Sequence, residues 1–384
     1  MSTGMNGTTA RGVFSSIAKA QAADLRGGVV IWIANGGSYD IKQNTAGASF
    51  ILNNGNGAFL RSEGALSPGN NPANIEWDFE VVFNDGVELR SGYGARNSNG
   101  NKSVDFSRAS DSGCENKSGI VELISADNPC ISDSGLSVYG SYINYFSNPQ
   151  SPSTQSITIP SGTYTLWIIG AGSATTIYGT VTEDNEVTFT TTGESITVTV
   201  AGNVELCNLI NLNKIAPPIL NNAAPSARST DVSSIMIENN LPKNSSPFTI
   251  LADFIGVNDG SDHRVVSNLN DIYLRSFGSN AFINFGIKTK EGDRQIVSNF
   301  SVESGFKYRA IVVVNPGYKS EIYMNSVMVG STNTIASTDI DFTKNLYIGS
   351  YNGSIFNINS NIKSIKIAHT ALTYDQVQSL GVYN

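Results

Sequence analysis

The sequence predicts an all-β protein made of several small antiparallel modules, with one short N-terminal helix. Short runs of alternating apolar and polar residues recur along the chain, separated by turns rich in Asn, Gly and Ser. Only 15% of the 384 residues are charged, against about 25% in an ordinary soluble domain. The chain instead carries 42 Asn, 48 Ser and 37 Gly, together with 17 Phe and 15 Tyr. This composition excludes a coiled coil and a disordered charged tail.

The N-terminal segment, residues 1–28, is predicted to be the helical one. Phe14, Ile17 and Leu25 recur at helical spacing on one face, and Gly27 begins a Gly-Gly pair that would end the helix. A helix this short is marginal alone in water. It therefore either packs on its own domain or docks into a larger assembly.

Residues 29–105 are predicted to be an N-terminal β region of short strands, such as 29–33 and 77–83, joined by amide-rich turns. Residues 106–150 are expected to form a loop-rich connector.

A small Thr-rich β-sandwich module is predicted over residues 151–213. Apolar residues alternate with Ser and Thr on both sides of Pro160-Ser161-Gly162, where a turn is expected, and again over 187–200. A module of about 60 residues buries too little surface to be very stable alone, so it should pack against a neighbour or against copies of itself. Residues 214–230 hold three prolines and predict an extended linker.

The largest unit is expected over residues 231–384, where strand-like runs alternate with turns as in an antiparallel sandwich. A short helix is predicted near the end, with Leu372, Val377 and Leu380 on one face.

Charge, cysteine content and the lengths of the apolar runs limit the possible partners and cellular compartments. The net charge is −8, and the 24 basic residues are scattered, which argues against nucleic-acid binding. Cys114 and Cys130 either bridge a loop or remain thiols. Since the total of three is odd, the cysteines cannot all pair within the chain, and the sequence favours buried free thiols, which fits folding in a reducing cytosol. No apolar run is long enough for a secretion signal or a membrane span, so neither export by a signal nor membrane insertion is expected.

Three segments carry a family resemblance. VDFSRAS (104–110) resembles a segment of tailed-phage structural proteins, and residues 155–215 with the following linker resemble a β-module of phage tail and head appendages. The C-terminal unit resembles a concanavalin A-like (laminin-G-like) jelly roll in its central hairpin (306–332) and in its closing strands and helical turn (345–380). The hairpin has Asn325-Ser326 where that family usually has Asn-Gly, and Tyr308 stands where the family often has Trp.

The resemblance implies a non-enzymatic structural appendage on the exterior of a phage virion, made in the host cytoplasm. A tail fibre that presents the sandwich to a host-surface glycan is the first expectation, and a head fibre or decoration protein is the second. The N-terminal region, through Phe14, Ile17 and Leu25, would attach it to other virion proteins. A homotrimer is expected, as in fibres generally.

Ligand residues are predicted from their chemistry. Tyr347, Tyr351 and Asn352 combine aromatic faces and an amide, which suit sugar recognition. Asn258, Asp259 and Asp262 could supply oxygen ligands to calcium, or form an ordinary turn. No other cofactor is expected.

The enzymatic alternative is a capsule-degrading glycoside hydrolase on the same sandwich, which needs paired carboxylates. The candidates are Glu183, Asp184 and Glu186 in one loop, and Asp339 and Asp341 in another. A solvated polar face explains both groups more simply, and no hydrolase motif accompanies them.

Overall fold

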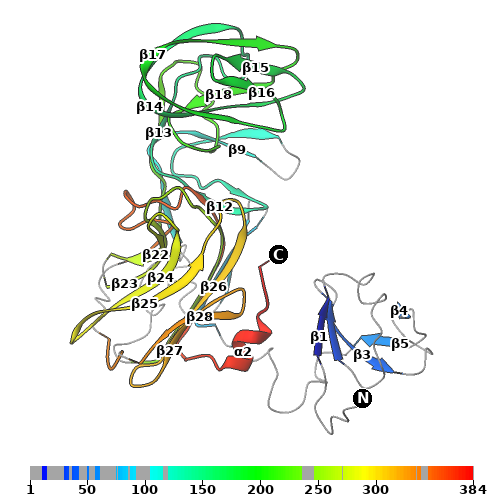
Figure 1. Cartoon of the computed structure of the whole chain (residues 1–384), viewed down its shortest axis with the longest axis vertical. Helices are drawn as coiled ribbons and strands as arrows, with labels where there is room; N and C mark the ends of the chain where they lie inside the picture. Colours follow the sequence, from blue (N-terminus) through cyan, green and yellow to red (C-terminus); the bar gives the residue numbers. More distant parts are fainter. Residues whose placement is uncertain are drawn as a thin grey trace. The chain divides into compact units, whose positions relative to one another are not determined.

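The protein is all-β, and its chain divides into two units, Met1–Asn74 and Ile75–Asn384. The computed structural model describes residues 11–14, 30–33, 37–42, 50–51, 57–60, 75, 77–84, 87–91, 104–115, 120–235, 246–269, 271–333, 335–338 and 345–383. Figure 1 traces them along the chain. Within these ranges, no helix has the length and apolar character needed to cross a membrane.

The first unit holds a five-stranded sheet in the order β1-β2-β3-β5-β4, in which β1 and β2 are parallel and the other pairs antiparallel. Its strands are β1 (Arg11–Phe14), β2 (Val30–Ile33), β3 (Gly37–Lys42), β4 (Phe50–Ile51) and β5 (Gly57–Leu60). Phe14 thus lies in a strand and not in the predicted helix, because its RGVF segment pairs with the β-prone VIWI segment. Ile17 and Leu25 lie outside the described residues.

The second unit is built around a β-sandwich of two sheets. Sheet I has nine strands: β6 (Phe79–Asn84), β7 (Val87–Ser91), β11 (Ile131–Ser132), β12 (Gly135–Val138), β21 (Phe248–Ile255), β26 (Lys307–Val314), β27 (Ser320–Met324), β28 (Val327–Thr332) and β30 (Ser360–Ala368). Sheet II has seven strands: β8 (Val104–Ser107), β20 (Val232–Ile235), β22 (His263–Asn268), β23 (Ile272–Phe277), β24 (Phe282–Thr289), β25 (Gly292–Ser301) and β29 (Leu346–Ile348).

One apolar core fills the space between the two sheets. Phe254 and Ile365 of sheet I and Leu274 and Phe285 of sheet II are fully buried in it. Burying a side chain of this size contributes about 1.5–3 kcal/mol, so this continuous core is the main source of stability for the sandwich.

The C-terminal sandwich was expected to begin at residue 231. In the structure it also contains strands from well before that residue. β6 and β12 lie along one edge of β30, and β8 pairs with β20. The expected boundary at 231 and the expected connector over 106–150 therefore do not match the sheets. Pairing between strands more than 100 residues apart leaves no local signal in the sequence.

The Thr-rich module is consequently an insertion between β12 and β20. Its sheet runs β16-β15-β17-β14-β18-β13-β19. The strands are β13 (Tyr142–Asn144), β14 (Gln155–Ile169), β15 (Ser173–Thr176), β16 (Gly179–Val181), β17 (Val187–Ala201), β18 (Leu206–Ile210) and β19 (Ser226–Arg228). β9 (Ser112–Glu115) and β10 (Val121–Ile124) form a separate pair.

The alternation predicted in the module is confirmed, but the predicted turn at residues 160–162 is wrong. Ile157, Ile159, Tyr164 and Leu166 are all buried in one core. β14 continues as one strand through Pro160, paired with β17 without interruption. The strand survives because Pro160 lies opposite Gly193, whose φ of +104° gives the partner an irregular residue at that point.

Hydroxyl groups line the opposite face of the module. Thr163 and Thr190, Thr165 and Thr188, and Thr175 and Thr180 are hydrogen-bonded across neighbouring strands at 2.8–3.0 Å. Cross-strand Thr pairs of this kind each contribute a few tenths of a kcal/mol. The excess of Thr therefore has a structural role in the module.

The segment 214–230 does not run free as the linker that its prolines suggested. Ala216, Ile219 and Leu220 are buried against Trp167 of β14 in a second small core. The backbone amide of Gly113 also donates to the Pro218 carbonyl, at 2.7 Å. The segment is therefore a packed part of the module.

A buried ion network lies where the chain leaves and re-enters the sandwich. Asp231 accepts hydrogen bonds from Arg108 Nη1 at 3.3 Å, from Arg228 Nη2 at 2.7 and 2.9 Å, and from the Tyr139 amide at 2.9 Å. The side chains of Asp231 and both arginines have no exposed surface. Arg108 follows β8 of the sandwich and Arg228 ends β19 of the module, so this network joins the two.

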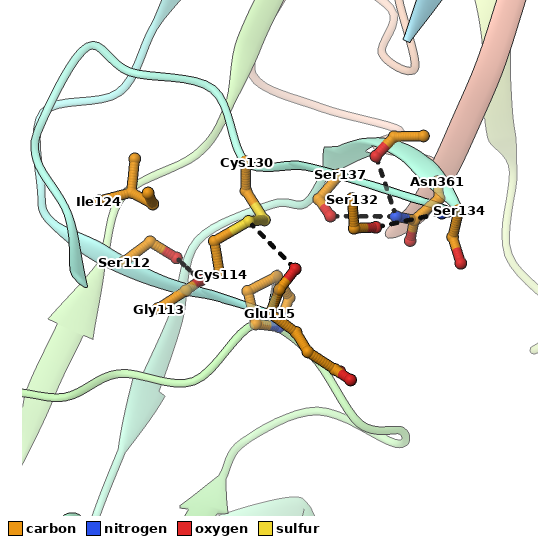
Figure 2. The surroundings of a disulfide bond; sticks show 12 residues. Ser112, Gly113, Cys114, Glu115, Ile124, Cys130, Ser132, Ser134, Ser137 and Asn361 are labelled. Carbon is orange, nitrogen blue, oxygen red and sulfur yellow. Dashed lines mark hydrogen bonds between the residues drawn. A yellow bond between two sulfur atoms is a disulfide. The ribbon is translucent and has the colours of Figure 1, made fainter. Parts of the chain in front are cut away.

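Cys114 and Cys130 form a disulfide, as Figure 2 shows, so the expectation of free thiols was wrong for this pair. The Cys114 sulfur, on β9, is bonded to that of Cys130, which lies just before β11. Cys207 is a buried free cysteine, and burial raises the pKa of its thiol. Sequence spacing could not select between the two states, because contact depends on how β9 returns to the sandwich.

The predicted C-terminal helix is confirmed as α2 (Tyr374–Ser379), which begins with a capping box made by Thr373 and Gln376. Val377 and Leu372 pack with Tyr323 on the outer face of sheet I, and Leu380 packs against them.

Candidate functional site

Two loops that the sequence singled out meet beside the first residues of β22. The backbone amide of Arg264 donates to the Phe356 carbonyl at 3.0 Å, and His263 Nδ1 lies 2.7 Å from the Asn357 carbonyl oxygen. Residues 258–262, which precede β22, are therefore held next to residues 350–357, which follow β29.

The two carboxylates predicted as calcium ligands are engaged by basic side chains. Asp259 Oδ1 lies 2.7 Å from His263 Nε2, and although burial alone would raise the pKa of Asp259, its contact with His263 lowers it. Asp262 Oδ2 accepts from Arg264 at 3.3 Å and from Arg275 at 2.8 Å. In the described part of the chain, no three His, Cys, Asp or Glu residues are grouped as a metal site would require.

The three residues predicted to bind sugar have different surroundings and do not form one site. Tyr351 lies beside Arg264, with 5.5 Å between the guanidinium carbon and the ring centre, and packs edge-on against Phe356. Asn352 accepts from the Ser354 amide at 3.1 Å and so shapes the turn, while Tyr347 lies in β29. Only Tyr351 joins a group of functional side chains.

Arg264, beside Tyr351, belongs to a row of residues that lie opposite one another on four neighbouring strands of sheet II. Arg264 of β22 is opposite Arg275 of β23, which is opposite Asn284 of β24, which is opposite Val297 of β25. Four adjacent strands span about 14 Å at 4.8 Å per step. The row lies on the face away from the core, because its members alternate with buried core residues such as Leu274.

Aromatic rings surround the two guanidinium groups. The Arg264 carbon lies 4.3 Å from the ring centre of Tyr273, and the Arg275 carbon lies 4.2 Å from that of Phe277. Phe356 approaches Arg264 at 5.8 Å. Cation–π contacts at these distances stabilise each charge by roughly 0.5–2 kcal/mol.

Even so, several polar atoms of these side chains have no hydrogen-bond partner. We call Asp262, Arg264, Arg275 and Asn284 the arginine cluster. Five of its atoms are buried without a partner: Asp262 Oδ1, Arg264 Nε and Nη1, Arg275 Nε and Asn284 Oδ1. The side chains of Arg264 and Arg275 are only 6% and 13% exposed. Leaving a buried polar atom unpaired costs about 1–3 kcal/mol, so such a concentration calls for an explanation.

The cluster also carries a surplus positive charge. Two guanidinium groups share a single carboxylate, that of Asp262, among the residues that the structure describes. Burial lowers the pKa of Arg264, the contact with Asp262 raises it, and the charge of Arg275 lowers it further. The arrangement therefore favours an anion.

The cluster opens toward solvent at its Arg275 end. Phe277 is 46% exposed and Val297, at the end of the row, is 60% exposed. A ligand can therefore meet an apolar rim beside partly buried charge, which is the usual make-up of a binding site.

Sequence reasoning missed the two arginines. The available signal was the alternation in IYLRSF (272–277), which places Tyr273, Arg275 and Phe277 on one face and Ile272 and Leu274 on the other. Arg264 could not be found in this way, because its role depends on its register with β23 and on a loop about 90 residues later. Among the acids weighed for hydrolysis, Glu183, Asp184 and Glu186 lie exposed in one loop, and Asp339 and Asp341 lie outside the described residues.

No protein-family model and no curated protein matches the chain. Among solved structures, the chain is similar to the CBM40 domain of the Ruminococcus gnavus IT-sialidase, with 10% identity and a TM-score of 0.31, over 36% of this chain and 83% of that one. It is also similar to the binding domain of botulinum neurotoxin DC, with 16% identity and a TM-score of 0.32 over 39% of each chain. A heptameric pentraxin from Limulus polyphemus is similar as well, with 18% identity and a TM-score of 0.27, over 36% of this chain and 71% of that one. Likenesses this distant carry no statement about function.

Proposed function

We propose that the chain is a non-enzymatic appendage of a tailed-phage virion, a tail fibre in the first instance, whose β-sandwich recognises an acidic glycan at the arginine cluster. The observation that carries the binding site is the set of five unpartnered buried atoms around a surplus positive charge. The virion assignment rests on the resemblance of residues 104–384 to phage structural proteins. A homotrimer attached through its N-terminal region belongs to the same proposal.

A carboxylate-bearing sugar fits the cluster for two reasons. The planar guanidinium fork matches a carboxylate in two parallel hydrogen bonds, and the incoming negative charge offsets the surplus positive one. The rings of Tyr273 and Phe277 supply apolar faces of the kind that pack against the C–H groups of a pyranose.

The binding test uses the full chain, because a fragment beginning at residue 231 would lack β6, β8 and β12. Affinities for uronic-acid oligosaccharides are measured by titration calorimetry, beside the same oligosaccharides after reduction of their carboxyl groups to alcohols. We expect the acidic form alone to bind well. Arg275→Gln should weaken it by about 10- to 150-fold, the equivalent of one hydrogen bond to a charged group.

The matched control is Lys290→Gln, which removes one positive charge from an exposed position in the turn between β24 and β25, outside the cluster. It should change affinity less than threefold. Equal binding of acidic and reduced sugars, or equal losses in the two variants, would contradict recognition at the cluster. Unchanged thermal melting of Arg275→Gln is the check that the sandwich remains folded.

The virion assignment has a separate test. Gold-labelled antibodies against this chain should decorate intact particles at the tail. Labelling at the head would support a head fibre or decoration protein, and absence from particles would overturn the virion assignment while leaving the sugar titrations valid.

A further inference from the structure

A hollow lined by both polar and apolar side chains lies on the outer face of sheet I, on the other side of the sandwich from the arginine cluster. It has a volume of about 470 Å³ and lies between the β27–β28 hairpin and α2. This volume falls within the range of small-molecule sites in proteins. Ser326 of the tight β27–β28 turn and Tyr374 at the start of α2 form two of its walls.

The walls are fixed by contacts that do not depend on a ligand. Asn325 and Ser326 both have positive φ, +48° and +66°, as a tight two-residue hairpin requires. Ser326 Oγ donates to the Gly381 carbonyl at 2.8 Å, and Gln378 Nε2 donates back to the Ser326 carbonyl at 2.5 Å. Because Val377 of α2 is also buried in the same apolar cluster as Tyr323 of β27, the helix cannot easily slide relative to the hairpin.

The floor of the hollow presents a compensated pair of charges. Glu321 lies between Lys319 Nζ, 2.6 Å from its Oε1, and the Tyr323 hydroxyl, which donates to its Oε2 at 2.5 Å. Burial alone would raise the pKa of Glu321, but these two hydrogen bonds lower it, so the carboxylate is ionised at neutral pH. In contrast to the arginine cluster, this hollow has no surplus charge that would select an ion.

An aromatic platform stands beside this pair. The Tyr374 side chain is 62% exposed, and its ring centre lies 6.5 Å from that of Tyr323. Val327 and Met328 add exposed apolar surface on the hairpin. Exposed aromatic and apolar groups beside fixed donors and acceptors match a ring that has apolar C–H faces and several hydroxyl groups.

We propose that this hollow binds a neutral sugar residue, with its C–H face on Tyr374 and its hydroxyl groups on Glu321, Lys319 and Gln378. The site is independent of the acidic-glycan site. Two sites of different charge preference on one sandwich would let the protein hold two parts of a heteropolysaccharide, with a gain in apparent affinity from their linkage.

The test uses the full chain and a panel of neutral disaccharides (cellobiose, maltose, lactose and N,N′-diacetylchitobiose) at millimolar concentrations. Saturation-transfer NMR should show transfer to ring C–H protons of at least one of them. Tyr374→Ala should weaken that binding by about 2- to 12-fold, the range for one aromatic contact, while Tyr374→Phe keeps the ring and should retain it. Glu321→Gln should weaken it by about tenfold or more.

Two controls locate the effect. Tyr318→Ala removes an equally exposed tyrosine outside the hollow and should leave binding unchanged. Arg275→Gln should do the same, because it affects only the acidic-glycan site, so the two proposals fail separately. Absence of transfer to the whole panel, or transfer that Tyr374→Ala leaves intact, would overturn the neutral-sugar site. An exposed side chain such as Tyr374 can be removed without unfolding, which thermal melting checks.

Discussion

Replacing Asp231 with Asn is the most direct test of how the inserted module is joined to the sandwich. The substitution keeps the shape of the side chain and one acceptor oxygen, so it creates no cavity. It removes the single negative charge that Arg108 and Arg228 share. The effect is therefore electrostatic and occurs where water cannot compensate.

The size of the effect follows from the burial of the network. Removing one partner of a buried ion pair typically costs 3–5 kcal/mol, because the remaining charges stay buried and unpaired. All three side chains have no exposed surface, so the full range applies. A domain is stable by only 5–15 kcal/mol in total. At 2–4 °C per kcal/mol, Asp231→Asn should lower the melting temperature by roughly 6–20 °C.

The assay combines thermal melting with limited trypsin digestion. The Arg228 side chain has no exposed surface in the native protein, so cleavage after this residue should be slow in the wild type and fast in the variant. Asp133→Asn is the control, since this exposed aspartate should change stability by no more than about 0.5 kcal/mol. A melting temperature for Asp231→Asn within 2 °C of the wild type, with no new cleavage, would refute the assigned role of the network.

Three further predictions concern single features. Replacing both Cys114 and Cys130 with Ser should lower the free energy of unfolding by about 3 kcal/mol, the loop-closure value for a sequence separation of 16. The wild type, denatured without reduction, should expose one reactive thiol, that of Cys207, and a count of three thiols would disprove the disulfide. Burial lowers the pKa of Lys214 to about 8, so this side chain binds more protons in the unfolded chain than in the folded chain between about pH 8 and 10. The stability of the wild type relative to a Lys214→Met variant should therefore rise with pH in that window, and a difference that stays constant would contradict this assignment. Ser326→Ala should cost about 1 kcal/mol in chemical denaturation, by loss of the hydroxyl contacts to Val377 and Gly381, whereas an equal loss in Ser331→Ala would mean that the hydroxyl at 326 has no special role.

Features with a local cause could be predicted from the sequence. The all-β class, the alternation in the Thr-rich module and α2 with Leu372 and Val377 all follow from spacing and turn chemistry within a few residues. The turn at Asn325-Ser326 was expected from the resemblance to the family's central hairpin, and the structure confirms it, with positive φ at both residues.

Features that depend on distant partners could not be predicted. The prolines of 214–230 indicated a linker, but burial of Ile219 and Leu220 against Trp167 decided their structure. The candidate site was reached only in part, since Asp262 and Tyr351 were weighed for other reasons. Arg264 and Arg275 become neighbours only through the register of β22 with β23. An isolated arginine in a strand carries no sign of the residue opposite it.

The strand order also dictates a sequence of events on the ribosome. β12 and β6 must wait for β30, which is made last among their partners; Val138 pairs with Ser360, 222 positions later. The inserted module, whose strands all lie between 142 and 228, can complete its own sheet during that delay. A nascent chain therefore carries a finished module beside strands that still lack one partner, whose free edges are open to pairing with other chains. Translation speed and chaperone supply over the last 150 residues should decide how much protein reaches the native state.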